Sequence, residues 1–130
     1  MLLSYLIVDH LFDYSYLDRI SSNSSELHLE MLEIFLDLGR KVYDELRVFS
    51  VGQQKDSIVL CFTSLYSNFR ILGLHQLLRE AETLEQKIQE SSGVIGEDMK
   101  PRITKFTNNL SLALEQAERD ILQYKESLKV

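Results

Sequence analysis

Residues 58 to 74 read Ile-Val-Leu-Cys-Phe-Thr-Ser-Leu-Tyr-Ser-Asn-Phe-Arg-Ile-Leu-Gly-Leu, and their spacing indicates the fold. Apolar side chains recur at intervals of three and four residues, the period of a helix with one face in a core. That inner face consists of Ile58, Cys61, Phe62, Leu65, Phe69 and Leu72. We therefore expect one helix from Gln54 to Leu72, joined to the next helix at Gly73.

Similar apolar stripes on both sides of this segment predict further helices. The expected ranges are 14–20, with Asp13 or Ser15 as the cap, about 23–49, 74–91 and about 98–128. Asn23 and Glu26 have the spacing of a capping box, and Pro101 falls in a first turn, where a missing N–H is tolerated. The helix from Asn23 has its stripe at Leu27, Met31, Ile34, Phe35, Leu38, Val42, Leu46 and Phe49. The last helix has its stripe at Met99, Ile103, Phe106, Leu110, Leu114, Ala117, Ile121, Tyr124 and Leu128.

Length and composition favour a single all-α domain. The 130 residues include only one proline and five glycines, so long stretches lack helix breakers. Amphipathic helices with short connections bury their stripes best in an antiparallel four-helix bundle. We predict such a bundle over residues 1–130, with an additional N-terminal helical segment and an apolar extension at 1–12. Gly39 lies within a helix, where it indicates a close helix crossing.

Charge and cysteine content restrict the function classes. A net charge of −6 argues against nucleic-acid binding, which requires clustered cations. Cys61 is the single cysteine, so an internal disulfide is impossible and we expect a cytoplasmic protein. Its apolar neighbours suggest a small buried hydrophobe rather than a reactive thiol. The apolar N-terminus is too short to span a membrane and does not look like a signal peptide.

The segment 58–74 resembles the signature helix of histidine phosphotransfer (HPt) domains, whose pattern is roughly His-x-Leu-Lys-Gly-Ser-Ala-x-x-x-Gly. Leu65 and Gly73 match the scaffold positions of that pattern. The chemical positions differ, because Thr63 stands where the family has its phosphorylated His, Tyr66 where it has Lys, and Ser67 where it has its small Gly. Residues 11–20 and 31–36 also look like the segments that precede the signature helix.

The resemblance implies a four-helix bundle that docks receiver domains through the outward face of this helix. We expect that face to carry the partner-binding residues Val59, Thr63, Tyr66, Ser67 and Arg70, with Arg70 as a possible substitute for the family's cation. Phosphorelay needs a nitrogen nucleophile and a high-energy phosphoramidate. A threonine hydroxyl would form a stable ester instead, so we expect no relay through Thr63.

No other residue pattern supplies catalytic or metal chemistry. His10, His28 and His75 stand away from the motif position, and each is interpreted as an ordinary surface or partly buried histidine. There is no zinc spacing of Cys and His, no Glu-x-x-His pair and no glycine-rich phosphate loop. We expect no catalytic residue, no metal and no cofactor.

The leading hypothesis is a non-enzymatic signalling module that binds a response-regulator receiver domain or a histidine kinase. The alternative is a helical assembly protein, in which the apolar N-terminus and the long last helix form a homodimer. An enzyme or metal-binding bundle is a third class that no constellation of residues supports.

Overall fold

The protein is all-α in the part that the structure, a computed structural model, describes: residues 11–49, 52, 55–91 and 93–128. No β-strand occurs among these residues, which confirms the all-α part of the predicted fold class. The α-helices are α2 (Ser15–Ser21), α3 (Ser25–Arg47), α4 (Lys55–Thr63), α5 (Tyr66–Ile71), α6 (His75–Gln89) and α7 (Lys100–Leu128), with a 3-10 helix η1 (Glu97–Met99) before α7. Apart from Leu11 and Phe12, the predicted N-terminal extension lies outside the described residues.

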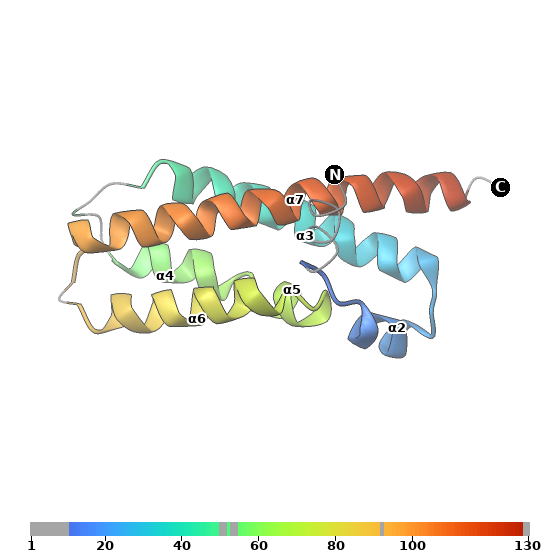
Figure 1. Ribbon diagram of the computed structural model, residues 1–130, viewed down its shortest axis with the longest axis horizontal. Coiled ribbons are helices and arrows are strands. Elements are labelled where there is room, and N and C mark those ends of the chain that lie inside the picture. The colour runs from blue at the N-terminus through green and yellow to red at the C-terminus, as the bar shows by residue number, and fades with distance from the viewer. Residues whose placement is uncertain (1–10, 50–51, 53–54, 92, 129–130) are drawn as a thin grey trace, which may run out of the picture.

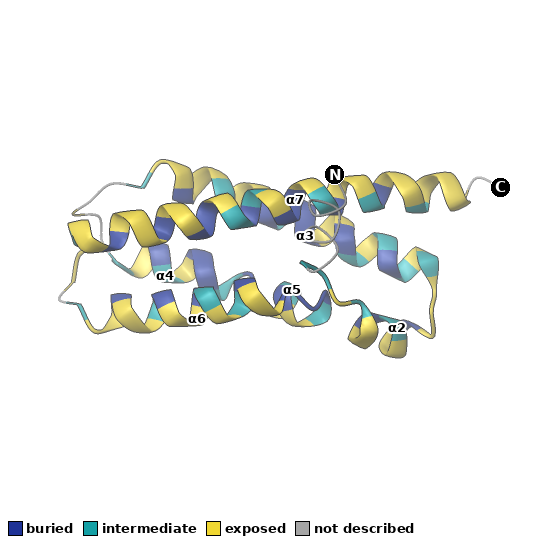
Figure 2. Cartoon of the chain, viewed as in Figure 1, coloured by how far each residue is buried: buried dark blue, intermediate teal, exposed yellow. Residues whose placement is uncertain are grey.

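The helices form two layers (Figure 1). In one layer α3 lies along α7, and in the other α4 and α5 lie along α6. The layers meet through contacts of α3 with α4 and of α6 with α7, and α2 packs against α3. Buried residues line the helix surfaces that face one another (Figure 2).

Aromatic rings hold the two layers together at the centre of the core. Phe35 of α3 and Phe106 of α7 each contact Phe69 of α5, with ring centroids 6.3 Å apart in both pairs. Phe62 of α4 contacts Phe106 with centroids 5.1 Å apart. All four rings are fully buried and meet edge to face, the arrangement that the ring quadrupole favours. These contacts anchor α4 and α5, the two helices that contain most of residues 58–74, from their buried side.

The close crossing expected at Gly39 is confirmed. A Cβ at this position would lie 2.5 Å from Leu114 Cδ2 of α7, so only a glycine lets the two helices approach this far without displacing that side chain. The predicted stripe of α7 is also largely correct, since Ile103 through Ile121 are buried at the expected positions. Its last members differ, because Tyr124 is half-buried and Leu128 is exposed.

The predicted stripe and cap of α3 need correction. Ile34 is 47% exposed, whereas Leu32, Leu36 and His28 are buried. The buried arc is rotated because α3 contacts α2, α4 and α7 on different sides, and the helix has enough apolar residues to fit more than one stripe. The cap is Ser24, whose Oγ accepts a hydrogen bond from the Leu27 N–H at 3.3 Å. Asn23 has φ +62°, outside the extended region that an N-cap residue adopts.

The single helix predicted over 54–72 was wrong, because the chain breaks it between Thr63 and Tyr66. The Thr63 hydroxyl donates to the Leu60 carbonyl at 3.3 Å and the Ser64 hydroxyl to the Cys61 carbonyl at 2.9 Å. The Leu65 N–H donates to the Phe62 carbonyl at 3.1 Å, three residues back instead of four. Hydroxyl side chains that bond nearby carbonyls compete with the regular ladder, which explains the tightened turn at this point.

Candidate functional site

The helix break places Thr63 at the end of α4 and Tyr66 at the start of α5. Among the five residues that the sequence predicts as a partner-binding face, only Ser67 and Arg70 are exposed. Val59, Thr63 and Tyr66 are half-buried, and Val59 and Tyr66 pack against the core. The five residues are divided between two helices, with Val59 and Thr63 on α4 and Tyr66, Ser67 and Arg70 on α5.

Tyr66 is held against α6 through its hydroxyl group. Its hydroxyl donates to Glu85 Oε1 at 2.5 Å. Burial raises the pKa of Tyr66, and the hydrogen bond and negative charge of Glu85 raise it further, so the phenol stays protonated. The guanidinium carbon of Arg70 lies 5.7 Å from the centroid of the Tyr66 ring, within cation–π range. Tyr66 thus positions Arg70, which keeps an exposed positive charge.

Leu60 also belongs to this surface, although the predicted partner-binding face does not include it. The side chain is 67% exposed, on the last part of α4. It precedes Ser67 by seven residues, about two helical turns. The sequence could have indicated its exposure, because Leu60 is an apolar residue outside the inner stripe of residues 58–72. We call Leu60, Thr63, Ser67 and Arg70 the α4–α5 surface.

Gly73 connects this surface to the segment before α2. Its φ is +66°, and a Cβ there would overlap the carbonyl oxygen of Asp13 and lie 2.7 Å from the carbonyl carbon. The Asp13 N–H donates to the Leu72 carbonyl at 3.2 Å, which holds the two chain segments together. The glycine is required for two reasons, its left-handed backbone and the close approach of another chain segment.

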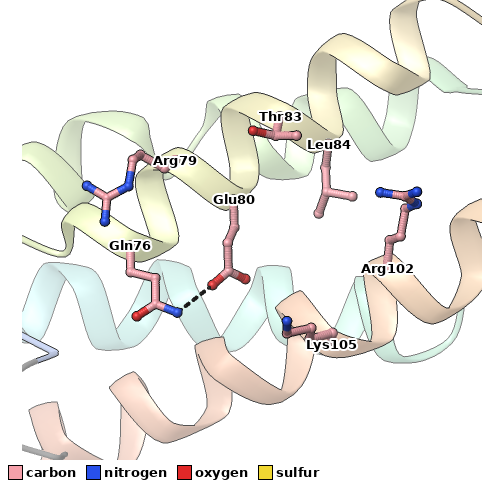
Figure 3. Close-up of a pocket in the computed structure, with 7 residues that line it drawn as sticks. All are labelled: Gln76, Arg79, Glu80, Thr83, Leu84, Arg102 and Lys105. Atoms are coloured by element: carbon pink, nitrogen blue, oxygen red, sulfur yellow. Dashed lines mark hydrogen bonds between the residues drawn. The ribbon is translucent and has the colours of Figure 1, made fainter.

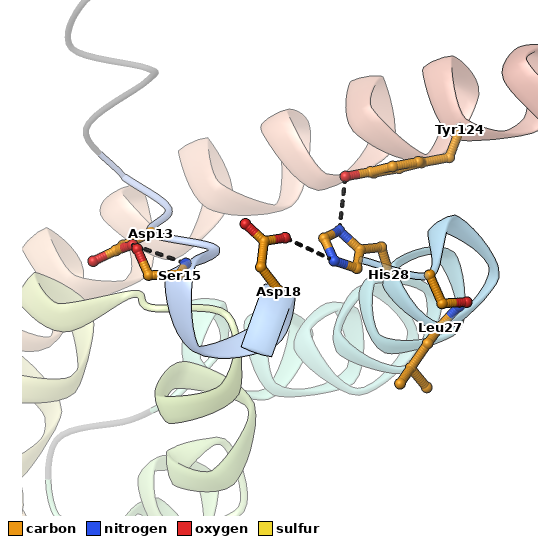
Figure 4. A network of polar contacts seen from close by, with 7 residues as sticks. Asp13, Ser15, Asp18, Leu27, His28 and Tyr124 are labelled. Atoms are coloured by element: carbon orange, nitrogen blue, oxygen red, sulfur yellow. Dashed lines mark hydrogen bonds and ion pairs between the residues drawn. The ribbon is translucent and has the colours of Figure 1, made fainter. Parts of the chain in front are cut away.

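His28 proved to be more buried and more connected than an ordinary histidine (Figure 4). Its Nδ1 lies 2.9 Å from the Tyr124 hydroxyl and its Nε2 lies 3.0 Å from Asp18 Oδ1. Nearby, the Tyr14 hydroxyl donates to Asp120 Oδ2 at 2.6 Å, and burial raises the pKa of Tyr14.

These contacts link α2, α3 and α7. Burial also raises the pKa of Tyr124, the opposite of what an activated nucleophile needs, so the cluster stabilises the packing of the three helices. Sequence spacing offered no signal for it, because Asp120 and Tyr124 of α7 are about a hundred residues from their partners Tyr14 and His28.

The other histidines also stand away from the α4–α5 surface. His75, at the start of α6, is exposed, and its Nε2 lies 3.3 Å from Asp13 Oδ2. His10 lies outside the described residues. No described histidine is therefore available beside Thr63 to accept a phosphoryl group.

Cys61 is buried, as predicted. Its thiol donates to Glu45 Oε2 at 3.0 Å. Burial raises the pKa of the thiol to about 12, with a further contribution from Glu45, so the reactive thiolate is scarce at neutral pH.

Within the described ranges, no group of three His, Cys, Asp or Glu side chains is arranged to hold a metal ion. In the same part of the chain, none of the helices combines the length and apolar character that crossing a membrane requires. No family model matches the chain, and no curated protein or solved structure matches it either. A functional assignment therefore depends on the residues and their geometry.

Proposed function

We propose that the chain is a non-catalytic signalling module that docks a receiver domain or a histidine kinase in the cytoplasm. In this proposal α3, α4 with α5, α6 and α7 form an antiparallel four-helix bundle of the HPt type, and α2 is an N-terminal addition. The partner contacts the α4–α5 surface and its half-buried neighbours Val59 and Tyr66, and no phosphoryl group is relayed.

The observation that carries the proposal is the environment of Thr63. This residue stands at the position of the phosphorylated His, and its hydroxyl donates to the Leu60 carbonyl of its own helix. No acidic or imidazole base is hydrogen-bonded to that hydroxyl in the described residues, whereas a hydroxyl nucleophile needs one. The burial of Leu65 and the turn at Gly73 support the proposal, because a scaffold residue should be buried and a closing glycine should allow a tight turn.

The chemistry of the α4–α5 surface supports docking. Leu60 exposes a large apolar side chain, Ser67 is small enough to permit close approach, and Arg70 adds a positioned cation. Arginine is enriched in protein interfaces and among their energetically dominant residues, and the exposed leucine adds apolar area to the same surface.

Binding to the receiver domains and histidine kinases of the source organism tests the proposal, with immobilised protein and purified partners. Leu60→Asp should weaken binding at least tenfold, because burying a carboxylate in an interface is costly. Leu122→Asp is the matched control, since Leu122 is 59% exposed on α7 and lies outside the α4–α5 surface. Absence of binding to every receiver and kinase, or equal losses in both variants, would contradict the proposal.

A gain-of-function variant tests the position of Thr63 separately. Thr63→His should accept label from a phosphorylated receiver as an acid-labile phosphoramidate, whereas the wild-type protein should not. Ser57→His, on the preceding turns of α4, serves as the control for an exposed histidine elsewhere on the helix. Labelling of a histidine in the wild-type protein would refute the assignment as a non-relaying module.

A homodimeric assembly protein is the second candidate, and one observation favours it. Leu122 lies on α7 between Glu118 and Lys125, which form ion pairs with Arg40 and Glu33 of α3. An exposed leucine in this seam, with Ile34 also exposed on α3, would be covered in a two-fold dimer. Sedimentation equilibrium should then show a dimer that Leu122→Asp dissociates and Leu60→Asp does not. A monomer at all concentrations, with and without residues 1–11, would exclude it.

A further inference from the structure

A hollow of about 450 Å³ lies between α6 and the first turns of α7 (Figure 3). It is lined by Gln76, Arg79, Glu80, Thr83, Leu84, Arg102 and Lys105. Arg102 and Lys105 extend from α7, and the other residues come from α6. The volume falls within the ~300–1,000 Å³ that is usual for small-molecule sites.

The hollow carries positive charge in an acidic protein. Arg79, Arg102 and Lys105 are all exposed, and within the described residues none has a carboxylate at ion-pair distance. Glu80 supplies the single negative charge, and its carboxylate accepts hydrogen bonds from Gln76 at 3.2 Å and Asn109 at 3.1 Å. Three cations and one carboxylate leave the lining with a charge of +2, against −6 for the whole chain.

The start of α7 also departs from the usual charge preference of helices. The first turn of a helix favours Asp and Glu because the macrodipole is positive there. The first turn of α7 contains no acid and instead carries Lys100 and Arg102; Glu97 and Asp98 precede it in η1. Lys100 and Arg102 thus add positive charge at the start of α7, next to the hollow that Arg102 lines.

We propose that this hollow binds a small molecule that bears a phosphate or diphosphate group. Arg102 and Lys105 from α7 would bind the phosphate oxygens through charge-assisted hydrogen bonds, and Arg79 from α6 adds positive charge to the lining. Thr83 adds a hydroxyl donor, and Leu84 gives an apolar surface for the organic part of the ligand. The net charge of −6 repels a long polyanion, so a compact anion is favoured over nucleic acid.

The test is a titration of the ¹⁵N-labelled protein with sodium pyrophosphate and with ATP, at constant ionic strength and without divalent metal ions. Amide shifts should saturate and centre on residues 79–84 and 102–105. The variant Arg102→Gln/Lys105→Gln should weaken binding at least tenfold, because it removes two charge-assisted contacts. Lys41→Gln/Lys87→Gln is the matched control, with the same change in net charge at exposed lysines outside the hollow. Thermal unfolding of both variants checks that they remain folded.

Each other outcome overturns the assignment. If neither ligand produces saturable shifts at about 10 mM, the site is excluded, because this concentration is far above the Kd of a specific site. Equally weakened binding in the control variant would show that binding depends only on the net charge of the protein. Tighter binding of a 12-nucleotide single strand than of ATP would assign the surface to nucleic acid. Co-sedimentation with phosphatidic-acid vesicles, without binding of free pyrophosphate or ATP, would place the phosphate group in a lipid headgroup.

Discussion

Replacing Gly73 by alanine should destabilise the protein more than any other glycine substitution in a loop. At φ +66° an alanine must adopt the left-handed backbone, which costs about 1–2 kcal/mol. The added Cβ would also overlap the Asp13 carbonyl, a backbone group that cannot rotate away. Moving Asp13 would break its hydrogen bond to the Leu72 carbonyl, worth a further ~0.5–1.5 kcal/mol. We therefore expect a loss of about 2–4 kcal/mol in the free energy of unfolding.

Gly93→Ala separates the two effects. Gly93 has φ +79°, but a Cβ at this position would meet nothing within 4 Å, so the alanine variant should lose only the backbone contribution, about 1–2 kcal/mol. Urea unfolding followed by circular dichroism measures both free energies. Hydrogen exchange of the Asp13 amide, which should accelerate in Gly73→Ala alone, locates the change. Equal losses in the two variants would show that the contact between Gly73 and Asp13 contributes nothing.

Three further predictions follow from buried or perturbed groups. His28→Ala should lower the free energy of unfolding by about 2–4 kcal/mol, because it opens a cavity and removes the partner of two polar groups. His75→Ala, at an exposed position, should lower it by under about 0.5 kcal/mol. Similar losses for the two variants in urea unfolding would contradict the burial of His28. The pKa of Asp13 is lowered to about 2, first by the side-chain hydrogen bond from Ser15, so its contribution is present above pH 3.8 and lost as the pH falls toward 2. Unfolding midpoints measured between pH 5 and pH 2 should therefore fall less steeply in Asp13→Asn, and identical slopes would argue against this linkage. Cys61 should resist a thiol reagent at pH 8 in the folded protein and react fully in urea, and rapid labelling without denaturant would be inconsistent with its raised pKa.

Much of the helical framework could be predicted from local pattern. The stripe of α7 and the close crossing at Gly39 follow from residue spacing and from the size of one side chain, which are properties of the chain itself. The α4–α5 surface was only partly predictable. Ser67 and Arg70 are exposed as expected, but Tyr66 is bound to Glu85, a residue of another helix that periodicity cannot locate. The exposed Leu60 was left out of the predicted face, although it precedes Ser67 by about two helical turns.

The sequence alone determined that this chain is helical and where most of its helices lie, whereas the assignment of Thr63 to the position of a phosphorylated histidine stays a prediction. Only the tertiary structure decided which arc of α3 is buried, that His28 joins three helices, and which cations surround the hollow between α6 and α7. The physical reason is how far apart in the sequence the interacting residues are. Helix formation depends on residues three and four apart, whereas burial, pKa and charge at a site depend on groups that are distant in the chain.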